Sequence, residues 1–175
     1  MTELSCRCGE VVMEVTGQPI VSVECCCTSC RTAAGRLESL PGAPRLFAES
    51  GAVPYVLFRK DRVRMIRGEE HLRDFRLGPE AATRRVVAGC CGSPVYLEFK
   101  GGHWLSVFGT LWPEGARPAL EMRTMAKDLP PGATLPEDVP NARTQPLGFM
   151  GRLLAAWVAM GFRAPKIQEH EALHV

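Results

Sequence analysis

All 8 cysteines of this 175-residue chain lie in three short clusters. Thiolates placed this close together are ligands for a soft divalent metal, and zinc prefers tetrahedral sites built from closely spaced sulfur pairs. The sequence therefore predicts zinc as a cofactor. The clusters are Cys6-Arg7-Cys8-Gly9, Cys25-Cys26-Cys27-Thr28-Ser29-Cys30-Arg31 and Cys90-Cys91-Gly92.

Structural disulfides are the alternative for so many cysteines. A secreted scaffold spreads its cysteines to link distant loops, whereas cysteines this close in sequence cannot bridge each other without severe strain. Met1-Thr2-Glu3-Leu4 runs into the first cluster without the charged and apolar regions of a signal peptide. The even cysteine count is compatible with both interpretations. We favour metal binding in a reducing compartment, which predicts a cytoplasmic location.

The middle cluster offers three sulfur ligands from six consecutive residues. On a strand, the side chains of Cys25 and Cys27 share one face, whereas that of Cys26 points to the other. Cys30 follows a Thr-Ser turn that brings a third sulfur round to the same metal. The fourth position is then either open to water or substrate, as in catalytic zinc, or closed by Cys26 or a distant residue. In the open case, the catalytic residues are Cys25, Cys27 and Cys30.

The first and third clusters each hold too few ligands for a zinc ion. Joined, they would supply four thiolates and tie the N-terminal strand to the middle of the sheet. Two adjacent cysteines on one metal is an awkward geometry. The alternative is that Cys90 or Cys91 is a packed free thiol, with water or another residue as the fourth ligand. The predicted metal ligands of this site are Cys6, Cys8, Cys90 and Cys91.

The chain that positions these clusters is predicted to be mainly β. Short segments rich in β-forming residues are separated by glycine, proline or charged breaks. Such spacing favours antiparallel strands in a sandwich or a barrel-like sheet. The expected strands are 11–15, 20–25, 53–58, 62–66, 73–77, 84–87, 95–99, 104–111 and 119–125.

The charge of the chain is close to neutral, with 21 Lys and Arg against 19 Asp and Glu. A net charge of +2 gives little reason to expect nucleic acid as the main partner. The locally basic stretch 59–64 is interpreted as the solvated face of a strand. A hydrophobic content of 46% suits a single core.

Beyond residue 127 the composition changes. Residues 147–162 are apolar apart from Arg152 and suit a helix, which is too short for a membrane span of roughly 18 or more apolar residues. This helix either packs on the sheet, forms a homodimer contact or lies on a surface. Residues 168–175 are expected to fray. The predicted domains are 1–127 for a zinc-binding β domain, 128–146 for a Pro-rich extension, and 147–175 for the C-terminal helix and tail.

Together, the three motifs resemble the family of glutathione-dependent formaldehyde-activating enzymes, which includes the centromere-protein-V type of domain. That family has Cys-x-Cys-Gly near the N-terminus, then Cys-His-Cys-x-x-Cys-Arg, then Cys-x-x-Cys-Gly before a hydrophobic strand. Here Cys26 stands in place of the His, and Ala88 in place of the first cysteine of the third motif. The adjacent-cysteine variant resembles an uncharacterised branch of the superfamily with a C-terminal helix. The matching segments are Ser5–Gly9, Cys25–Arg31 with Gly35, Cys90–Pro94 and Phe108–Leu111.

The resemblance implies a β-tent fold, in which short antiparallel sheets surround two zinc sites. Cys6, Cys8 and the third cluster would form a structural site, and the middle cluster would hold the functional zinc. The implied activity is that of a carbon–sulfur lyase, which joins glutathione and formaldehyde as S-(hydroxymethyl)glutathione. Zinc would there lower the pKa of a bound thiol or water.

Two functions of different classes follow. One is a zinc-dependent carbon–sulfur lyase that acts on the adduct of a small thiol such as glutathione. The other is a non-catalytic, zinc-stabilised binding module with an unidentified partner. The fourth ligand of a metal at the middle cluster distinguishes these two functions. An exchangeable ligand supports the enzyme, whereas a fourth protein sulfur supports the binding module. For acid–base work, His103 beside Trp104 is the one imidazole placed in the core, and a structural role is its alternative.

Overall fold

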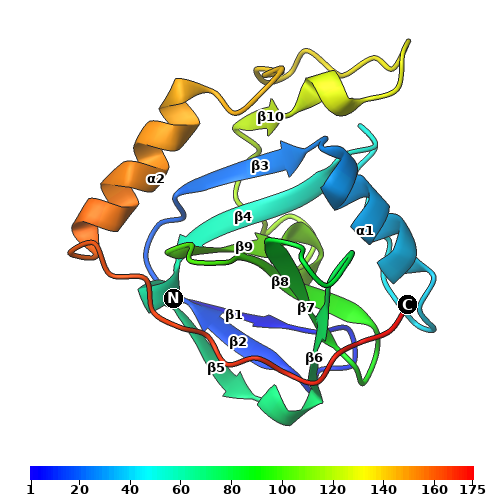
Figure 1. Ribbon diagram of the computed structural model, residues 1–175, viewed down its shortest axis with the longest axis vertical. Coiled ribbons are helices and arrows are strands. Elements are labelled where there is room, and N and C mark those ends of the chain that lie inside the picture. The colour runs from blue at the N-terminus through cyan, green and yellow to red at the C-terminus, as the bar shows by residue number, and fades with distance from the viewer.

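The computed structural model describes residues 1–175, whose strands form two sheets (Figure 1). The smaller sheet has the strand order β1-β2-β5, and the larger has the order β10-β3-β4-β9-β8-β7-β6. The protein is therefore mainly β, as predicted. The strands are β1 (Thr2–Ser5), β2 (Val12–Val15), β3 (Val21–Cys25), β4 (Val53–Arg59), β5 (Val63–Arg67), β6 (Leu72–Phe75), β7 (Thr83–Ala88), β8 (Ser93–Phe99), β9 (Trp104–Phe108) and β10 (Met122–Thr124).

The large sheet is antiparallel except at one edge. There β10 pairs with β3 in parallel, with Met122 opposite Val23 and Thr124 opposite Cys25. This differs from the expected antiparallel arrangement. A parallel pair needs a long connection, and the remaining strands of the sheet supply it. The pairing continues past β3, because the Cys26 N–H donates to the Thr124 carbonyl at 2.9 Å.

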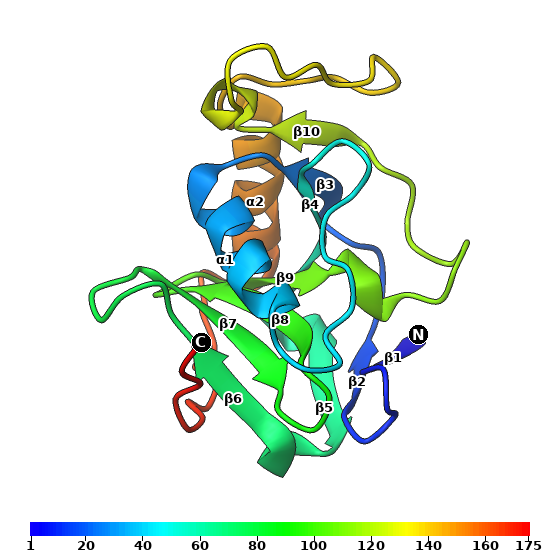
Figure 2. The same ribbon diagram turned by 90° about the vertical axis from the view of Figure 1, so that its right-hand side faces the viewer.

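Both faces of the large sheet are covered. Along β4, Val56 and Phe58 pack in the core shared with the small sheet, whereas Tyr55 and Leu57 pack in the core shared with the helices. Because alternate residues of a strand point to opposite faces, a strand buried on both sides is apolar throughout. Figure 2 shows α1 and α2 in the upper half of the molecule and the small sheet below. The helices are α1 (Thr28–Glu38) and α2 (Leu147–Ala159).

Helix α1 is not among the elements expected from the sequence, which indicates only a turn there. Its buried residues are spaced as i, i+3, i+4 and i+7, as on one face of a helix. Most of them are small, and Gly35 interrupts the segment, so the periodicity is weak in the sequence. Strand β1 is also missing from the expected elements. The buried residues of α1 are Cys30, Ala33, Ala34 and Leu37.

Helix α2 confirms the predicted C-terminal helix and packs on the protein, although it ends before residue 162. The sequence predicts an apolar face of Met150, Leu153, Leu154, Trp157 and Val158, but of these only Leu153 is buried, whereas Leu154 and Val158 are 56% and 53% exposed. Phe149, outside the predicted face, is buried as well. The His103 Nε2 contacts this buried side and lies 2.8 Å from the Leu153 carbonyl oxygen. A carbonyl oxygen only accepts hydrogen bonds, so Nε2 carries the proton. No helix of the protein combines the length and apolar character that crossing a membrane requires.

The Pro-rich extension is tied to β10 by Arg123. The Arg123 N–H donates to the Pro140 carbonyl at 2.9 Å, and its guanidinium binds the carboxylates of Asp138 and Glu24, each at 2.7 Å. A buried guanidinium needs such partners to offset its lost hydration. The extension therefore wraps against the edge of the sheet.

The C-terminal tail lies along β6 rather than fraying. The Asp74 N–H donates to the Glu171 carbonyl at 2.9 Å, and the Leu173 N–H donates to the Asp74 carbonyl at 2.8 Å. The buried Arg84 side chain also donates to the Ile167 carbonyl at 3.2 Å. An edge strand has unpaired backbone groups, and the tail bonds to those of Asp74 in β6.

Candidate metal sites

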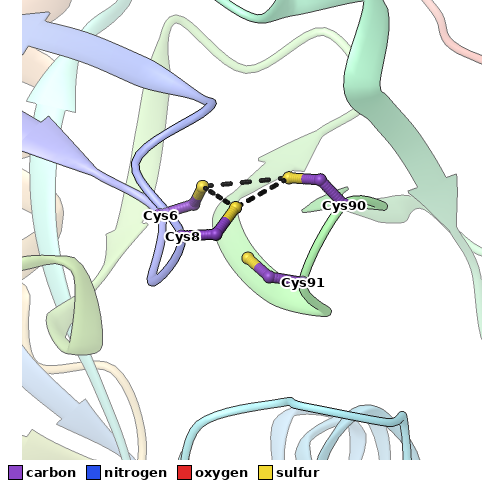
Figure 3. Close-up of side chains that lie close together, drawn as sticks. All are labelled: Cys6, Cys8, Cys90 and Cys91. Carbon is purple, nitrogen blue, oxygen red and sulfur yellow. Dashed lines mark hydrogen bonds between the residues drawn. The ribbon is translucent and has the colours of Figure 1, made fainter.

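The first candidate metal site joins the N-terminal loop to the turn between β7 and β8. The sulfur atoms of its four cysteines all lie within 4.8 Å of one another. Figure 3 shows Cys6, Cys8 and Cys90 facing one another, with Sγ–Sγ distances of 3.5, 3.4 and 3.9 Å, and Cys91 beside them. Tetrahedral zinc with Zn–S bonds of about 2.3 Å separates its sulfurs by about 3.8 Å. The donor set therefore fits such an ion.

Two tight turns place these sulfurs. In the first, the Gly9 N–H donates to the Cys6 carbonyl at 2.9 Å, and Gly9 has a φ of 81° that other residues rarely adopt. In the second, the Gly92 N–H donates to the Ala88 carbonyl at 2.8 Å. The Val11 N–H also donates to the Cys6 sulfur at 3.3 Å, as second-sphere donors do for metal-bound thiolates. Each glycine thus turns the chain directly beside its cysteine pair.

The thiols of this site have different environments. Burial raises the pKa of Cys6 and of Cys90. Burial acts in the same direction on Cys91, but hydrogen bonds from Ser93 and from the Cys8 backbone outweigh it and lower the pKa to about 6. A divalent cation would favour the thiolate form of all four cysteines. Without such a cation, the cysteines do not all favour that form, because the pKa values of Cys6, Cys90 and Cys91 are shifted in different directions.

The second candidate metal site lies where β3 gives way to α1. Cys25 is the last residue of β3, Cys27 is the N-cap of α1, and Cys30 lies in the first turn of the helix. Their sulfur atoms lie within 4.8 Å of one another. Cys26, between them, is fully buried and outside this group. Of the two alternatives left open by the sequence, the structure favours the one in which Cys26 lies outside the group, and a helix N-terminus, not a turn, presents Cys30.

The N-terminus of α1 stabilises a thiolate at Cys27. Hydrogen bonds from the thiols of Cys25 and Cys30 lower the pKa of Cys27 to about 2, and the Cys30 N–H and the charge of Arg85 act in the same direction. The Cys30 N–H lies 3.3 Å from the Cys27 sulfur. Free N–H groups at a helix N-terminus favour a negative charge there.

The second site differs from the first in that all of its cysteines line one cavity, whereas Cys90 is the only cysteine of the first site that lines one. The cavity of the second site has a volume of about 350 Å³, and the side chains of Cys25, Cys27 and Cys30 all line it. Helix α2 forms one wall through Phe149 and Leu153. Three sulfur ligands leave a fourth metal position, and a small molecule in the cavity can reach it.

Arg85 is a residue of this site that the sequence analysis misses. It lines the cavity, it is fully buried, and it has no carboxylate partner. Its neighbour Arg84 binds Asp74 at 2.7 Å and Glu98 at 2.5 Å on the other face of β7. The sequence does carry a signal for this residue. Arg84 and Arg85 are adjacent in a strand that continues with apolar residues. Because adjacent residues of a strand point to opposite faces, one of the two arginines must lie on each face of the sheet.

Comparison with known proteins settles the family. The sequence model of the family described as "Glutathione-dependent formaldehyde-activating enzyme" matches residues 1–125. The chain belongs to this family. The family match ends at residue 125, so the Pro-rich extension and helix α2 lie outside the part of the chain that this family shares.

The chain was also compared with solved structures and with curated proteins. A crystal structure of a Rhodobacter sphaeroides protein is similar at 20% sequence identity, with a TM-score of 0.48, and the match covers 80% of this chain and 99% of that chain. No curated protein matches the chain.

The two departures from the family pattern have clear places in the structure. Cys26, at the family's His position, is buried away from the three-cysteine group. Ala88, at the position of the family's first cysteine in the third motif, is buried in the core between the sheets, while Cys90 supplies a sulfur to the four-cysteine group. All seven predicted ligands therefore lie in the two groups. Their binding of a metal stays a prediction.

Proposed function

We propose that this protein is a zinc-dependent enzyme that joins and separates a small thiol and formaldehyde. Cys25, Cys27 and Cys30 would hold the functional zinc. The observation that supports this is the cavity, because all three cysteines line it and a ligand inside it could therefore reach a metal that they would hold. Membership of the formaldehyde-activating family supports the choice of reaction.

The reaction is an addition and its reverse. The thiol sulfur forms a bond to the carbonyl carbon, the second carbon–oxygen bond breaks, and the thiol proton ends on the oxygen. Nothing is oxidised or reduced, so no further reactant is needed. A zinc ion would supply Lewis acidity and lower the pKa of the thiol.

The chain's own residues would bind and shield the reactants. The three cysteines hold the metal, and the buried Arg85 offsets the negative charge of their thiolates. Phe149 and Leu153 close the cavity on the side of α2, which limits contact with water. His103 is absent from the cavity lining and binds the helix backbone, so it has no part in proton transfer.

We further propose that Cys6, Cys8, Cys90 and Cys91 hold a structural zinc. In this proposal residues 1–127 form the metal-binding domain, and residues 128–146 and 147–175 are additions that complete the cavity. The cytoplasmic location and the homodimer stay predictions.

The test is catalysis by the zinc-loaded protein. Exchange NMR measures how fast formaldehyde adds to glutathione and, in parallel, to benzyl mercaptan. We expect an exchange rate above the uncatalysed rate for at least one thiol, and loss of that increase in Cys27→Ser. Cys26→Ala is the matched control, because Cys26 is adjacent but outside the three-cysteine group.

Two results would contradict the proposed function. No increase for either thiol with a fully zinc-loaded protein would contradict the enzyme proposal and support a structural role for both metals. An equal increase in Cys27→Ser would remove this metal from the mechanism.

A further inference from the structure

The cavity beside the three cysteines is closed by a part of the chain outside the family match. Gln145, Phe149, Met150 and Leu153 line it, whereas the family model ends at residue 125. Helix α2, which carries the last three of these residues, is bound to the sheet by the hydrogen bond between His103 and the Leu153 carbonyl. The chemistry of this wall is therefore a property of this chain and does not follow from the family.

The rest of the lining is also largely apolar. Of the 19 residues around the cavity, ten are apolar and three are the cysteines of the site, and the remaining polar ones are neutral apart from Arg85. Aromatic rings come from Tyr55, Phe99 and Trp104 on the sheet. A cavity of this kind binds the apolar body of a ligand and offers few partners for ionised groups.

Arg85 is the one cation in the lining, and its bonding is already directed at the cysteine site. Its Nη2 donates to the Ser29 hydroxyl at 3.0 Å and to the Ser29 carbonyl at 3.3 Å, and its Nη1 donates to the Thr83 hydroxyl at 3.1 Å. Its Nε has no partner, and the side chain is fully buried. A buried guanidinium without a carboxylate partner is a place where one anionic group of a ligand can bind.

Glutathione fits this cavity poorly. It carries two carboxylates and an ammonium group, and each ionised group loses its hydration when it enters an apolar space. Arg85 is the one cation in the lining, so at most one of the two carboxylates finds a cationic partner there. An uncharged thiol with an aryl or branched alkyl body meets no such penalty, and its surface is removed from water against the aromatic and aliphatic walls.

We propose that the substrate of this site is a small, uncharged, apolar thiol, taken together with its formaldehyde adduct, and that helix α2 selects it over glutathione. This inference rests on the function proposed above, because it assumes that the thiol sulfur binds the metal held by Cys25, Cys27 and Cys30.

The test measures thiol binding, not turnover. The protein is loaded with Co²⁺, whose sulfur-to-metal absorption changes when another thiolate binds, and is titrated with benzyl mercaptan and with glutathione. We expect benzyl mercaptan to bind at least about tenfold more tightly. Tighter binding of glutathione would overturn the inference and leave the proposed function intact. Binding of neither thiol by the metal-loaded protein would contradict the proposed function itself.

Neighbouring leucines of α2 provide a matched pair of variants. Leu153 lines the cavity, and Leu154 is 56% exposed and does not. We expect Leu153→Ala to weaken benzyl mercaptan binding about tenfold, through lost apolar contact, and Leu154→Ala to leave it unchanged. Equal effects of the two would overturn the role given to this wall.

A third variant guards against a fold defect in Leu153→Ala. Met150 lines the cavity but is 47% exposed, so a longer charged side chain there can extend to solvent. Met150→Lys adds a cation at the rim. We expect it to strengthen glutathione binding and to weaken benzyl mercaptan binding. Unchanged affinity for both thiols would contradict the inference.

Discussion

The two cysteine groups differ in how far apart their residues lie in the chain. The four-cysteine group joins Cys6 to Cys90 across 84 residues, whereas the three-cysteine group is drawn from the six residues Cys25–Cys30. A cross-link that closes a long loop removes more entropy from the unfolded chain than one that closes a short loop. The first group is thus suited to stabilising the fold.

The groups differ in their surroundings as well. Cys8 and Cys90 are exposed at the surface, and four sulfurs leave a tetrahedral metal no free position. The three-cysteine group lines a cavity and has a buried cation beside it. With metal bound, the first group would therefore be saturated and the second would keep a position for a ligand, as we propose.

The largest expected effect is the loss of a ligand from the four-cysteine group. Cys6→Ser should lose most of the free energy of unfolding, because a structural zinc contributes on the order of 10 kcal/mol and a domain is stable by only about 5–15 kcal/mol. Urea denaturation and metal analysis measure this. Cys8→Ser is the matched variant, since Cys8 is exposed and its change disturbs no packing. Melting of both variants like the unaltered protein would remove the contrast between the groups.

The next effect concerns the three-cysteine group. Cys27→Ser should abolish thiol binding and reduce the metal content by one ion per chain, yet lower the free energy of unfolding by only about 1–2 kcal/mol, because the loop it closes is short. Thermal melts, metal analysis and thiol titration measure these. Collapse of this variant to the same extent as Cys6→Ser would indicate that both groups are structural.

A partial effect is expected at Arg85. Arg85→Met removes the cation that stabilises the Cys27 thiolate, so metal affinity at the three-cysteine group should fall about 10–100-fold. Arg84→Met is the control, because Arg84 binds Asp74 and Glu98 and should change stability without changing metal affinity. Competition with a metal-binding dye gives both affinities. The same affinity in Arg85→Met and the unaltered protein would exclude the proposed charge compensation.

The smallest effect is a pH dependence at His103. Burial lowers the pKa of His103, so the unfolded chain binds a proton at pH values where the folded chain does not. Its contribution to stability is therefore complete above the unfolded pKa of roughly 6.5 and falls as the pH drops below it.

Urea denaturation at pH 7 and pH 5 tests this for the unaltered protein and for His103→Gln, whose amide can still donate to Leu153. Between pH 7 and pH 5 the unaltered protein should lose more stability than His103→Gln, because only the histidine takes up a proton on unfolding. Identical pH dependence of the two proteins would show that this histidine does not titrate with folding.

The sequence alone predicts the features of the protein that depend on the spacing of residues close together in the chain. Close sulfur pairs identify metal-binding chemistry because ligand geometry acts over a few residues, and alternating apolar residues locate most strands of the sheet. Ligand counting also suggests that the first and third cysteine clusters meet. The long apolar run marks α2 for the same local reason.

Only the tertiary structure decides which surfaces meet. Helix α1 has only a weak apolar stripe and forms because the sheet covers its small residues. The helix in turn places Cys27 at its N-terminus. Arg84 and Arg85 are alike in sequence, but the face of β7 sends one to carboxylates and the other to the cysteines. The buried face of α2, and with it the cavity wall, depends on contact with His103. Such outcomes follow from packing between segments distant in the chain, which no local pattern specifies.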